Sequence, residues 1–243
     1  MQKQTKNSIL VFLAVFAVIS MSRGCVEKAS AQTVISGIQK MSGWQSCGAC
    51  AGTGGNGPNS SNSMIRFIKS PSLSGASAQF NISSSTAFAD ALWWKQLGPR
   101  NAATSFVYDL FFYIKNPTAS QALEFDVNQA NGKHRWVFGT QCNIAGGHWD
   151  VWANAAGHWK STGVHCSPPT AFKWHHLVWE FKRTATQVIF VAFTYDGVKH
   201  YINRTYPAKA SSTNELNVAY QMDMTSSHKA YSTWVDNVTL KYR

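Results

Sequence analysis

The stretch Leu123-Glu124-Phe125-Asp126-Val127-Asn128 alternates strictly between apolar and polar side chains. Successive side chains of a β-strand point to opposite faces, so this period of two predicts a strand with one face in a core. Glu124, Asp126 and Asn128 then share the other face. Two carboxyls and an amide are expensive to bury unpaired. We therefore expect this face to line a solvated cleft, bind an ion or contact a polar ligand, unless it is an ordinary solvated surface.

Two later segments, residues 174–182 and 216–223, alternate in the same way. The apolar faces of the three segments predict a core that contains Leu123, Phe125, Val127, Leu177, Trp179, Phe181, Val218 and Tyr220. The polar faces of the two later segments carry His176, Glu180, Lys182, Asn217, Gln221 and Asp223. Neighbouring strands with such faces would build a wet, concave groove, and we expect it to be lined by Glu124, Asp126, Asn128, Gln221 and Asp223.

The rest of the chain shows short runs of alternation separated by Gly, Asn, Pro and Ser, and no helical stripe follows residue 31. Asp196-Gly197 lies between two such runs and is the strongest hairpin signal. The expected strands are residues 64–68, 79–82, 92–95, 106–114, 122–129, 135–141, 174–182, 187–195, 198–204, 216–222 and 231–242. So many strands predict an all-β fold, a two-sheet antiparallel jelly-roll sandwich.

Residues 1–31 have the features of a signal peptide. Lys3 and Lys6 give a positive start, residues 9–21 are apolar, and Ala29-Ser30-Ala31 offers a small-x-small cleavage site. The apolar run is too short for a membrane span, and no second one follows. We expect a secreted protein, extracellular or periplasmic, with one domain in residues 32–243. Lipoprotein anchoring through Cys25 is the alternative, although Arg stands two residues before it, where a small apolar residue is preferred.

Cleavage after residue 31 would leave four of the five cysteines, and an even number in an exported protein indicates disulfides. Of the possible pairings we favour Cys142–Cys166, which would close a loop, with Cys47–Cys50 as a local pair. Cys47-Gly48-Ala49-Cys50 is alternatively a redox or zinc half-site. No βαβ pattern surrounds it, however, and no second Cys pair or His pair completes a metal site. We expect no metal and no cofactor.

The charge of the chain is basic but dispersed. It has 22 Lys and Arg against 11 Asp and Glu, a net charge of +11. A basic secreted protein can adhere to acidic polysaccharide, nucleic acid or anionic surfaces. Lys and Arg never form a run longer than two residues, so the sequence holds no clustered patch for nucleic acid. We interpret the charge as diffuse and expect no nucleic-acid partner.

Tryptophan residues are concentrated between the expected strands at residues 135–141 and 174–182. The chain has 10 Trp, and three of them lie in residues 146–159, between Cys142 and Cys166. The glycines of this segment are typical of a loop. Sugar rings have apolar faces that stack on aromatic side chains, and Trp149 and Trp152 are therefore candidate stacking residues. The alternative is that they close the end of the sandwich.

Three stretches resemble a known family. Trp174-His175-His176-Leu177-Val178-Trp179-Glu180-Phe181 is similar to the Trp-His-His strand of laminin-G-like domains, and residues 195–201 are similar to the hairpin that follows it there. Residues 234–240 look like the closing strand of such jelly rolls. The chain thus resembles the concanavalin A-like lectin/glucanase superfamily, which includes laminin-G-type domains, legume-type lectins and several glycanases. The resemblance covers the C-terminal third and is specific for fold more than for function.

The resemblance also implies a catalytic pattern to look for. Retaining glycanases of that superfamily commonly carry Glu-x-Asp-x-Glu on one strand, with the first Glu as nucleophile and the last as acid/base. Residues 124–128 are similar, but Asn128 replaces the last Glu, and an amide cannot protonate a leaving group. Glu124 is a catalytic carboxylate only if a second acid from another strand faces it. The candidates are Glu180, Asp223 and Glu215.

These observations favour a secreted, lectin-like protein that recognises a polysaccharide or other glycan in a concave sheet groove. The alternative is a glycoside hydrolase or a polysaccharide lyase with Glu124 as a catalytic carboxylate, and a lyase would need a Tyr or His base. A structural or adhesive surface protein without a small ligand is a third class. The feature that separates binding from hydrolysis is a second carboxylate facing Glu124.

Overall fold

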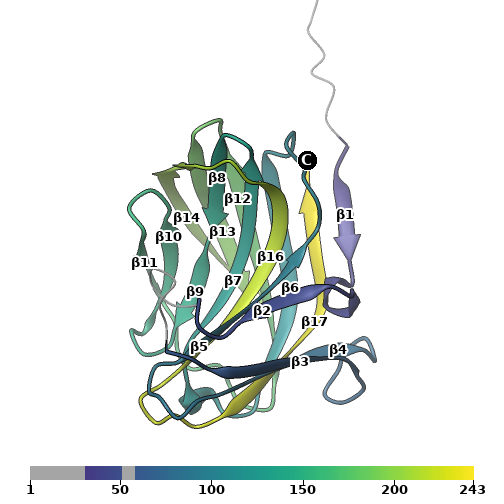
Figure 1. The fold of residues 1–243 in the computed structure, drawn as a ribbon, viewed down its shortest axis with the longest axis vertical. Coiled ribbons are helices and arrows are strands. Elements are labelled where there is room, and N and C mark those ends of the chain that lie inside the picture. Colours follow the sequence, from purple (N-terminus) through teal and green to yellow (C-terminus); the bar gives the residue numbers. More distant parts are fainter. Residues whose placement is uncertain (1–30, 51–57) are drawn as a thin grey trace, which may run out of the picture. The chain divides into compact units, whose positions relative to one another are not determined.

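The computed structural model describes residues 31–50 and 58–243. The expected signal peptide and the alternative lipid-anchor residue Cys25 lie outside the described residues. Within the described part, the chain folds into two antiparallel β-sheets packed face to face, as the sequence predicts (Figure 1). No helix of the described residues is long and apolar enough to cross a membrane.

The first sheet has eight strands. Its order is β14 (Val198–Pro207), β13 (Gln187–Tyr195), β12 (Trp174–Arg183), β6 (Ser105–Ile114), β17 (Tyr231–Tyr242), β4 (Ser77–Ser83) and β3 (Ser61–Ile68), with β1 (Thr33–Ser36) paired to β17. We call this sheet A. A short 3-10 helix, η1 (Ile38–Lys40), follows β1, and a second one, η2 (Pro117–Ala119), connects β6 to the next strand.

The second sheet, sheet B, has nine strands. Its order is β11 (His158–His165), β10 (His148–Ala153), β9 (Thr140–Asn143), β7 (Ser120–Asn131), β16 (Asn214–Met224), β5 (Asp90–Gln96) and β2 (Trp44–Cys47). Off this path, β8 (His134–Phe138) pairs with β7, and β15 (Lys209–Ala210) pairs with β8. The long strands β7 and β16 lie side by side at the centre of the sheet (Figure 1).

The hydrophobic core lies between the two sheets. All eight residues that the alternation predicts for the core are buried, with 2% or less of their surface exposed. Phe125 of β7 contacts both sheets, because its ring centroid is 5.2 Å from that of Phe112 on β6 and 5.4 Å from that of Tyr220 on β16. Burying a side chain of this size contributes about 1.5–3 kcal/mol. The predicted register is therefore confirmed: the apolar face of the decisive strand points inward.

Two sequence expectations about strands are wrong. Residues 135–141 form two strands, β8 and β9, which are interrupted at Gly139. Residues 146–159, expected to be a loop, contain β10 and the start of β11, which form a hairpin with Trp152 opposite Trp159. The glycines of this segment lie in the turns, where Gly147 and Gly157 adopt positive φ angles, and the residues between them include β10, whose pairing with β11 shifts register between His148 and Asp150.

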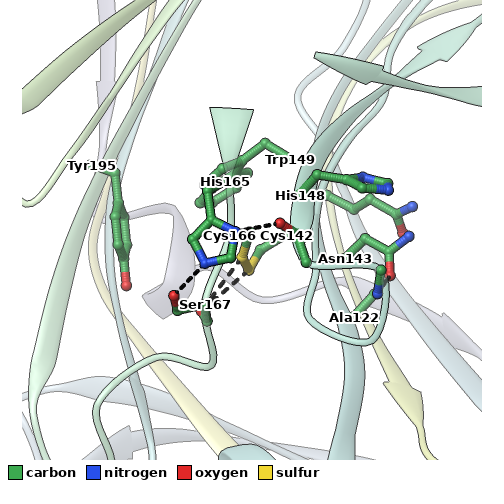
Figure 2. The surroundings of a disulfide bond; sticks show 12 residues. Ala122, Cys142, Asn143, His148, Trp149, His165, Cys166, Ser167 and Tyr195 are labelled. Carbon is green, nitrogen blue, oxygen red and sulfur yellow. Dashed lines mark hydrogen bonds between the residues drawn. A yellow bond between two sulfur atoms is a disulfide. The ribbon is translucent and has the colours of Figure 1, made fainter. Parts of the chain in front are cut away.

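Both expected disulfides are present. Cys142, on β9, is bonded to Cys166, which directly follows β11 (Figure 2). Next to this bond, the His165 ring donates from Nδ1 to the carbonyl of Gly147 at 2.7 Å, and Ser167 Oγ lies 2.8 Å from His165 Nε2. These contacts fix the open end of the β10–β11 hairpin to the sandwich. The second disulfide joins Cys47, at the end of β2, to Cys50.

Candidate functional site

A groove of about 620 Å³ crosses the face of sheet B that points away from the core. Strands β5, β16, β7 and β8 form its floor, and the β10–β11 hairpin forms one side. It is lined by Cys50, Leu92, Trp94, Glu124, Asp126, Asn128, Arg135, Val137, Gly139, Trp152, Asn154, Gly157, Trp159, Lys209, Thr213, Glu215, Asn217, Ala219 and Gln221.

The floor is built by the pairing of β7 with β16. Glu124 is opposite Gln221, Asp126 is opposite Ala219, and Asn128 is opposite Asn217. Opposed residues of an antiparallel pair point to the same face of the sheet, so these side chains meet in the groove. The structure thus brings together four of the predicted groove residues, and it places the fifth, Asp223, beside them at the next outward-facing position of β16.

Gln221 joins two acids at the centre of this floor. Its Nε2 donates to Glu124 Oε1 at 2.7 Å and to Asp223 Oδ1 at 2.9 Å. Asp223 is in turn opposite Asp90 of β5, so a third acid lies beside this pair.

Burial sets the charge state of these acids. It raises the pKa of Glu124 well above the ordinary value, and the charges of Asp223, Asp126 and Asp90 raise it further. The pKa of Asp223 is raised for the same two reasons, burial and the charge of Asp90. Burial also raises the pKa of Asp126 to about 7, against the lowering effect of the Thr140 amide and of Arg135. Of these three acids, Asp126 therefore changes its charge near neutral pH.

One end of the groove is a polar network around Glu215. Glu215 Oε2 accepts from Gln96 Nε2 at 2.8 Å and from Asn217 Nδ2 at 3.1 Å, and Arg135 Nη2 lies 3.6 Å from Glu215 Oε1. Asn128 Nδ2 donates to Asn217 Oδ1 at 3.0 Å. This network uses one of the two N–H donors of each asparagine.

Three tryptophans flank the floor. Trp152 and Trp159 pack edge to face, with ring centroids 5.1 Å apart, and both are partly exposed to the groove. Trp94 lines the groove from β5, four strand positions away from β10 in the sheet order. Neighbouring strands are about 4.8 Å apart, so the tryptophans lie at a separation of roughly 19 Å across the groove. Trp94 and Trp159 were not predicted.

Gly139 makes room for the tryptophan pair. A Cβ atom at this position would lie 2.9 Å from Trp152 Cβ and 3.5 Å from Trp159 Cη2. The first distance is shorter than carbon atoms tolerate, so any side chain here would push β10 away from its neighbours. Gly139, the residue that interrupts β8 and β9, thus lies where Trp152 and Trp159 pack against the sheet.

The prediction that Trp149 stacks on a ligand is wrong. Its side chain is buried in the core, 2% exposed, with its ring centroid 4.8 Å from that of Phe193 and 5.6 Å from that of Tyr195. Figure 2 shows it behind the Cys142–Cys166 bond. Trp149 and Trp152 are three residues apart on one strand, so they point to opposite faces, and only Trp152 reaches the groove.

Two of the three candidate second acids are also misplaced. Glu180 lies on β12 of sheet A, where its Oε1 is 2.6 Å from Lys199 Nζ, and so it belongs to the other side of the sandwich. Glu215 lies on the correct face but is opposite Ala130, six residues along β7 from Glu124. At about 3.4 Å per residue this separates them by roughly 20 Å. Asp223 is the candidate that the structure places next to Glu124.

A further polar cluster that the sequence did not reveal adjoins the floor. Asp150 is 1% exposed, and its Oδ2 accepts from Gln141 Nε2 at 2.8 Å and from Asn143 Nδ2 at 3.0 Å. His148 Nδ1 lies 2.6 Å from Asp150 Oδ1. Gln141 is opposite Glu124 in the β7–β9 pairing, so this cluster extends the polar row of the floor towards the hairpin. His148 and Asp150 lie in the segment expected to be a loop, so the face that Asp150 shares with Gln141 was not recognised.

Comparison with known proteins identifies the fold. No protein-family model matches the chain, and no curated protein does. Among solved structures, arcelin-5 of Phaseolus vulgaris, a lectin-like defence protein, superposes with a TM-score of 0.51 at 8% identity, covering 88% of this chain and 99% of its own. An endo-β-1,4-glucuronan lyase from Trichoderma reesei gives 0.48 at 10% identity, with coverage of 74% and 86%. A family 11 carbohydrate-binding module from Clostridium thermocellum gives 0.38 at 12% identity, with coverage of 87% and 96%. The two-sheet jelly-roll sandwich, expected from the sequence, is the fold of this chain.

Proposed function

We propose that this chain binds a polysaccharide in the groove of sheet B. Sugar rings stack on Trp152, Trp159 and Trp94, and their hydroxyls hydrogen-bond to the carboxyls and amides between them. The observation that supports this most directly is the combination of partly exposed tryptophans with a floor of hydrogen-bonding side chains in one groove. An apolar wall with a few convergent polar groups is the usual design of a small-ligand site.

The dimensions of the groove favour an extended ligand. Roughly 19 Å separates the hairpin tryptophans from Trp94, which is longer than one sugar ring. The rows of opposed residues run across the strands, and so a chain of sugars lying across sheet B would pass from Trp152 over Asp126 and Ala219 to Trp94. Along this path the tryptophans would supply apolar contact area for the sugar rings, and Asp126 would accept hydrogen bonds from sugar hydroxyls.

Secretion is part of the proposal. The two disulfides fit an oxidising compartment, where bonds of this kind persist. Polysaccharides are abundant outside cells, and a binding protein that meets them there needs the export signal that residues 1–31 are expected to supply.

Affinity measurements with matched tryptophan variants test the binding function. Isothermal titration with mixed-linkage β-glucan, glucomannan, amylose, alginate and polyglucuronate should identify a bound polysaccharide. Trp152→Ala and Trp159→Ala should each weaken that binding about fivefold or more, since a stacked ring contributes about 1 kcal/mol or more. The control is Trp174→Ala, which removes a partly exposed Trp from sheet A. Equal affinity of all three variants and the wild type would place the binding surface elsewhere.

Hydrolysis is the second candidate, and one observation favours it. Glu124 and Asp223 are adjacent acids whose pKa values are both raised, as is expected for a general acid next to a second carboxyl. The position directly opposite Glu124 is Gln221, however, and an amide cannot serve as the acid. The lyase alternative has less support, because the described residues that line the groove include neither Tyr nor His.

A reducing-sugar assay separates the two functions. We expect wild-type protein to bind its polysaccharide without releasing sugar. Release of reducing ends by the wild type and not by Glu124→Gln would replace the binding function with hydrolysis, because an amide at this position is a poor nucleophile.

A further inference from the structure

We propose, building on the proposed function, that the groove selects uncharged polysaccharide chains and rejects chains of uronic acids. The chain as a whole is basic, with a net charge of +11, so its overall charge would favour acidic polysaccharides. The groove itself has the opposite character, and it is the groove that meets the sugar rings.

The positive charges of the groove are confined to one end. Among the described lining residues only Arg135 and Lys209 are basic, and they are opposite each other in the β8–β15 pairing. Arg135 is already paired with Glu215. It is opposite Ala130, roughly 20 Å along β7 from Glu124. A uronate ring over the centre of the floor would therefore meet acids, and Arg135 already interacts with Glu215 and with Asp126, whose pKa it lowers.

Most hydrogen-bond donors of the floor amides are already used by the protein. Gln221 Nε2 donates to Glu124 and Asp223, Asn128 Nδ2 donates to Asn217, and Asn217 Nδ2 donates to Glu215. Each amide nitrogen carries two N–H groups, so four of these six donors are directed at the protein's own oxygens, and one remains on each asparagine.

Acceptors remain at the centre of the groove. Asp126 Oδ1 accepts from the amide of Thr140 at 2.9 Å, and Asp126 Oδ2 receives no hydrogen bond from the described residues. A hydroxyl of a neutral sugar can donate to such an oxygen, whereas a carboxylate is an acceptor only. A carboxylate placed here would be desolvated beside Asp126, which is strongly unfavourable when Asp126 is ionised.

The acids themselves make this selectivity dependent on pH. Near neutral pH Asp126 is partly ionised, because its pKa is about 7. At lower pH the floor holds more protons, and a protonated carboxyl can donate to a carboxylate. We therefore expect rejection of uronates to be strongest above neutral pH and to weaken as the pH falls.

The test converts one ligand into its charged counterpart. Whichever neutral chain binds, among mixed-linkage β-glucan, glucomannan and amylose, is oxidised at C6 so that its primary hydroxyls become carboxylates while the backbone linkages stay the same. We expect the oxidised chain to bind at least tenfold more weakly at pH 8, with a smaller difference at pH 5. Asp126→Asn should reduce the difference in affinity between the neutral and the oxidised chain at pH 8. Trp174→Ala should bind both chains as the wild type does, and Trp152→Ala should bind the neutral chain more weakly.

The outcomes separate this inference from the function on which it rests. If the oxidised chain, alginate or polyglucuronate binds as tightly as the neutral chain and depends equally on Trp152, the selectivity is overturned and the binding function stands. If no chain of either class binds in a way that depends on Trp152, the proposed function is overturned and the selectivity with it.

Discussion

Gln221 and Glu124, 97 residues apart in the sequence, face each other across β16 and β7, and Gln221 Nε2 donates to Glu124 Oε1 at 2.7 Å. The same nitrogen donates to Asp223. One amide thus supports two acids that would otherwise repel each other in a poorly solvated site. This arrangement explains how the sheet tolerates carboxyls at this density.

Stability should fall as the pH rises through neutrality. Asp126 has a folded-state pKa of about 7 and an ordinary value of 3.8, so the folded protein holds a proton that the unfolded chain releases between about pH 4 and pH 7. The free energy of unfolding therefore decreases across this window. We expect a lower Tm at pH 8 than at pH 5 in calorimetry, and a smaller decrease in Asp126→Asn. An equal decrease in the variant would contradict the assignment to Asp126.

Stability should also decline in strong acid, for the opposite reason. Hydrogen bonds from Ser74, Ser72 and Leu73 hold the pKa of Asp236 at about 2, below the ordinary 3.8, despite its burial. The unfolded chain therefore binds this proton first, and stabilisation by Asp236 is lost as the pH falls through 3.8 towards 2. Asp236→Asn should show a smaller loss of Tm between pH 5 and pH 2.5 than the wild type. A wild-type Tm that does not change between pH 5 and pH 2.5 would contradict stabilisation by ionised Asp236.

Adjacent substitutions on β7 should have very different effects. Phe125→Ala removes a ring packed between both sheets and should lower the free energy of unfolding by about 3–5 kcal/mol. Glu124→Gln replaces a carboxyl by an amide of nearly the same shape on the groove face and should cost much less. Urea denaturation of both variants measures the difference. Similar losses in the two would contradict the register of the strand.

Gly139→Ala should disturb the groove more than its small size suggests. The added Cβ would lie 2.9 Å from Trp152 Cβ, so β10 has to move. We expect a loss of about 1–3 kcal/mol in unfolding free energy, as for other overpacked positions, together with weaker polysaccharide binding. The intrinsic tryptophan fluorescence should shift in the same variant. Unchanged stability and affinity would show that the hairpin adapts freely.

The two disulfides should differ in their contribution to stability. The Cys142–Cys166 bond spans 24 residues, and replacing both cysteines by Ser should cost about 2–5 kcal/mol. The Cys47–Cys50 bond spans only 3 residues, and since loop entropy grows with length its replacement should cost less. Guanidinium denaturation of the two double variants compares them. A larger loss for the short bridge would contradict this expectation.

The fold and the floor of the groove could be predicted from the sequence because each depends on a local period of two. Residues 123–128 and 216–223 alternate without interruption, and burial of one face fixes which side chains face outward. The hairpin of β10 and β11 was missed because its glycines were interpreted as a loop. The same alternation is present there: Trp149, Val151 and Ala153 are buried together, while Trp152 faces the groove.

Other parts of the site depend on the arrangement of the sheets, which no local pattern reveals. Trp93 and Trp94 are adjacent, so one must face the core and the other the outside, but the sequence does not say which. Glu180 and Glu124 both lie on outward faces, and they are on different sheets because β12 pairs with β6 and β7 pairs with β16. Strand order comes from long-range packing, and the second acid could not be chosen without it.

The β10–β11 hairpin and the floor of the groove come from separate parts of the sheet. The two tryptophans of the hairpin that line the groove, Trp152 and Trp159, lie within residues 148–165, and the acids and amides of the floor come from β7 and β16. The Cys142–Cys166 bond fastens the hairpin at its open end. Under the proposed function, we expect exchange of the hairpin, with the disulfide retained, to change which sugar is bound while the floor keeps its preference for hydroxyl donors.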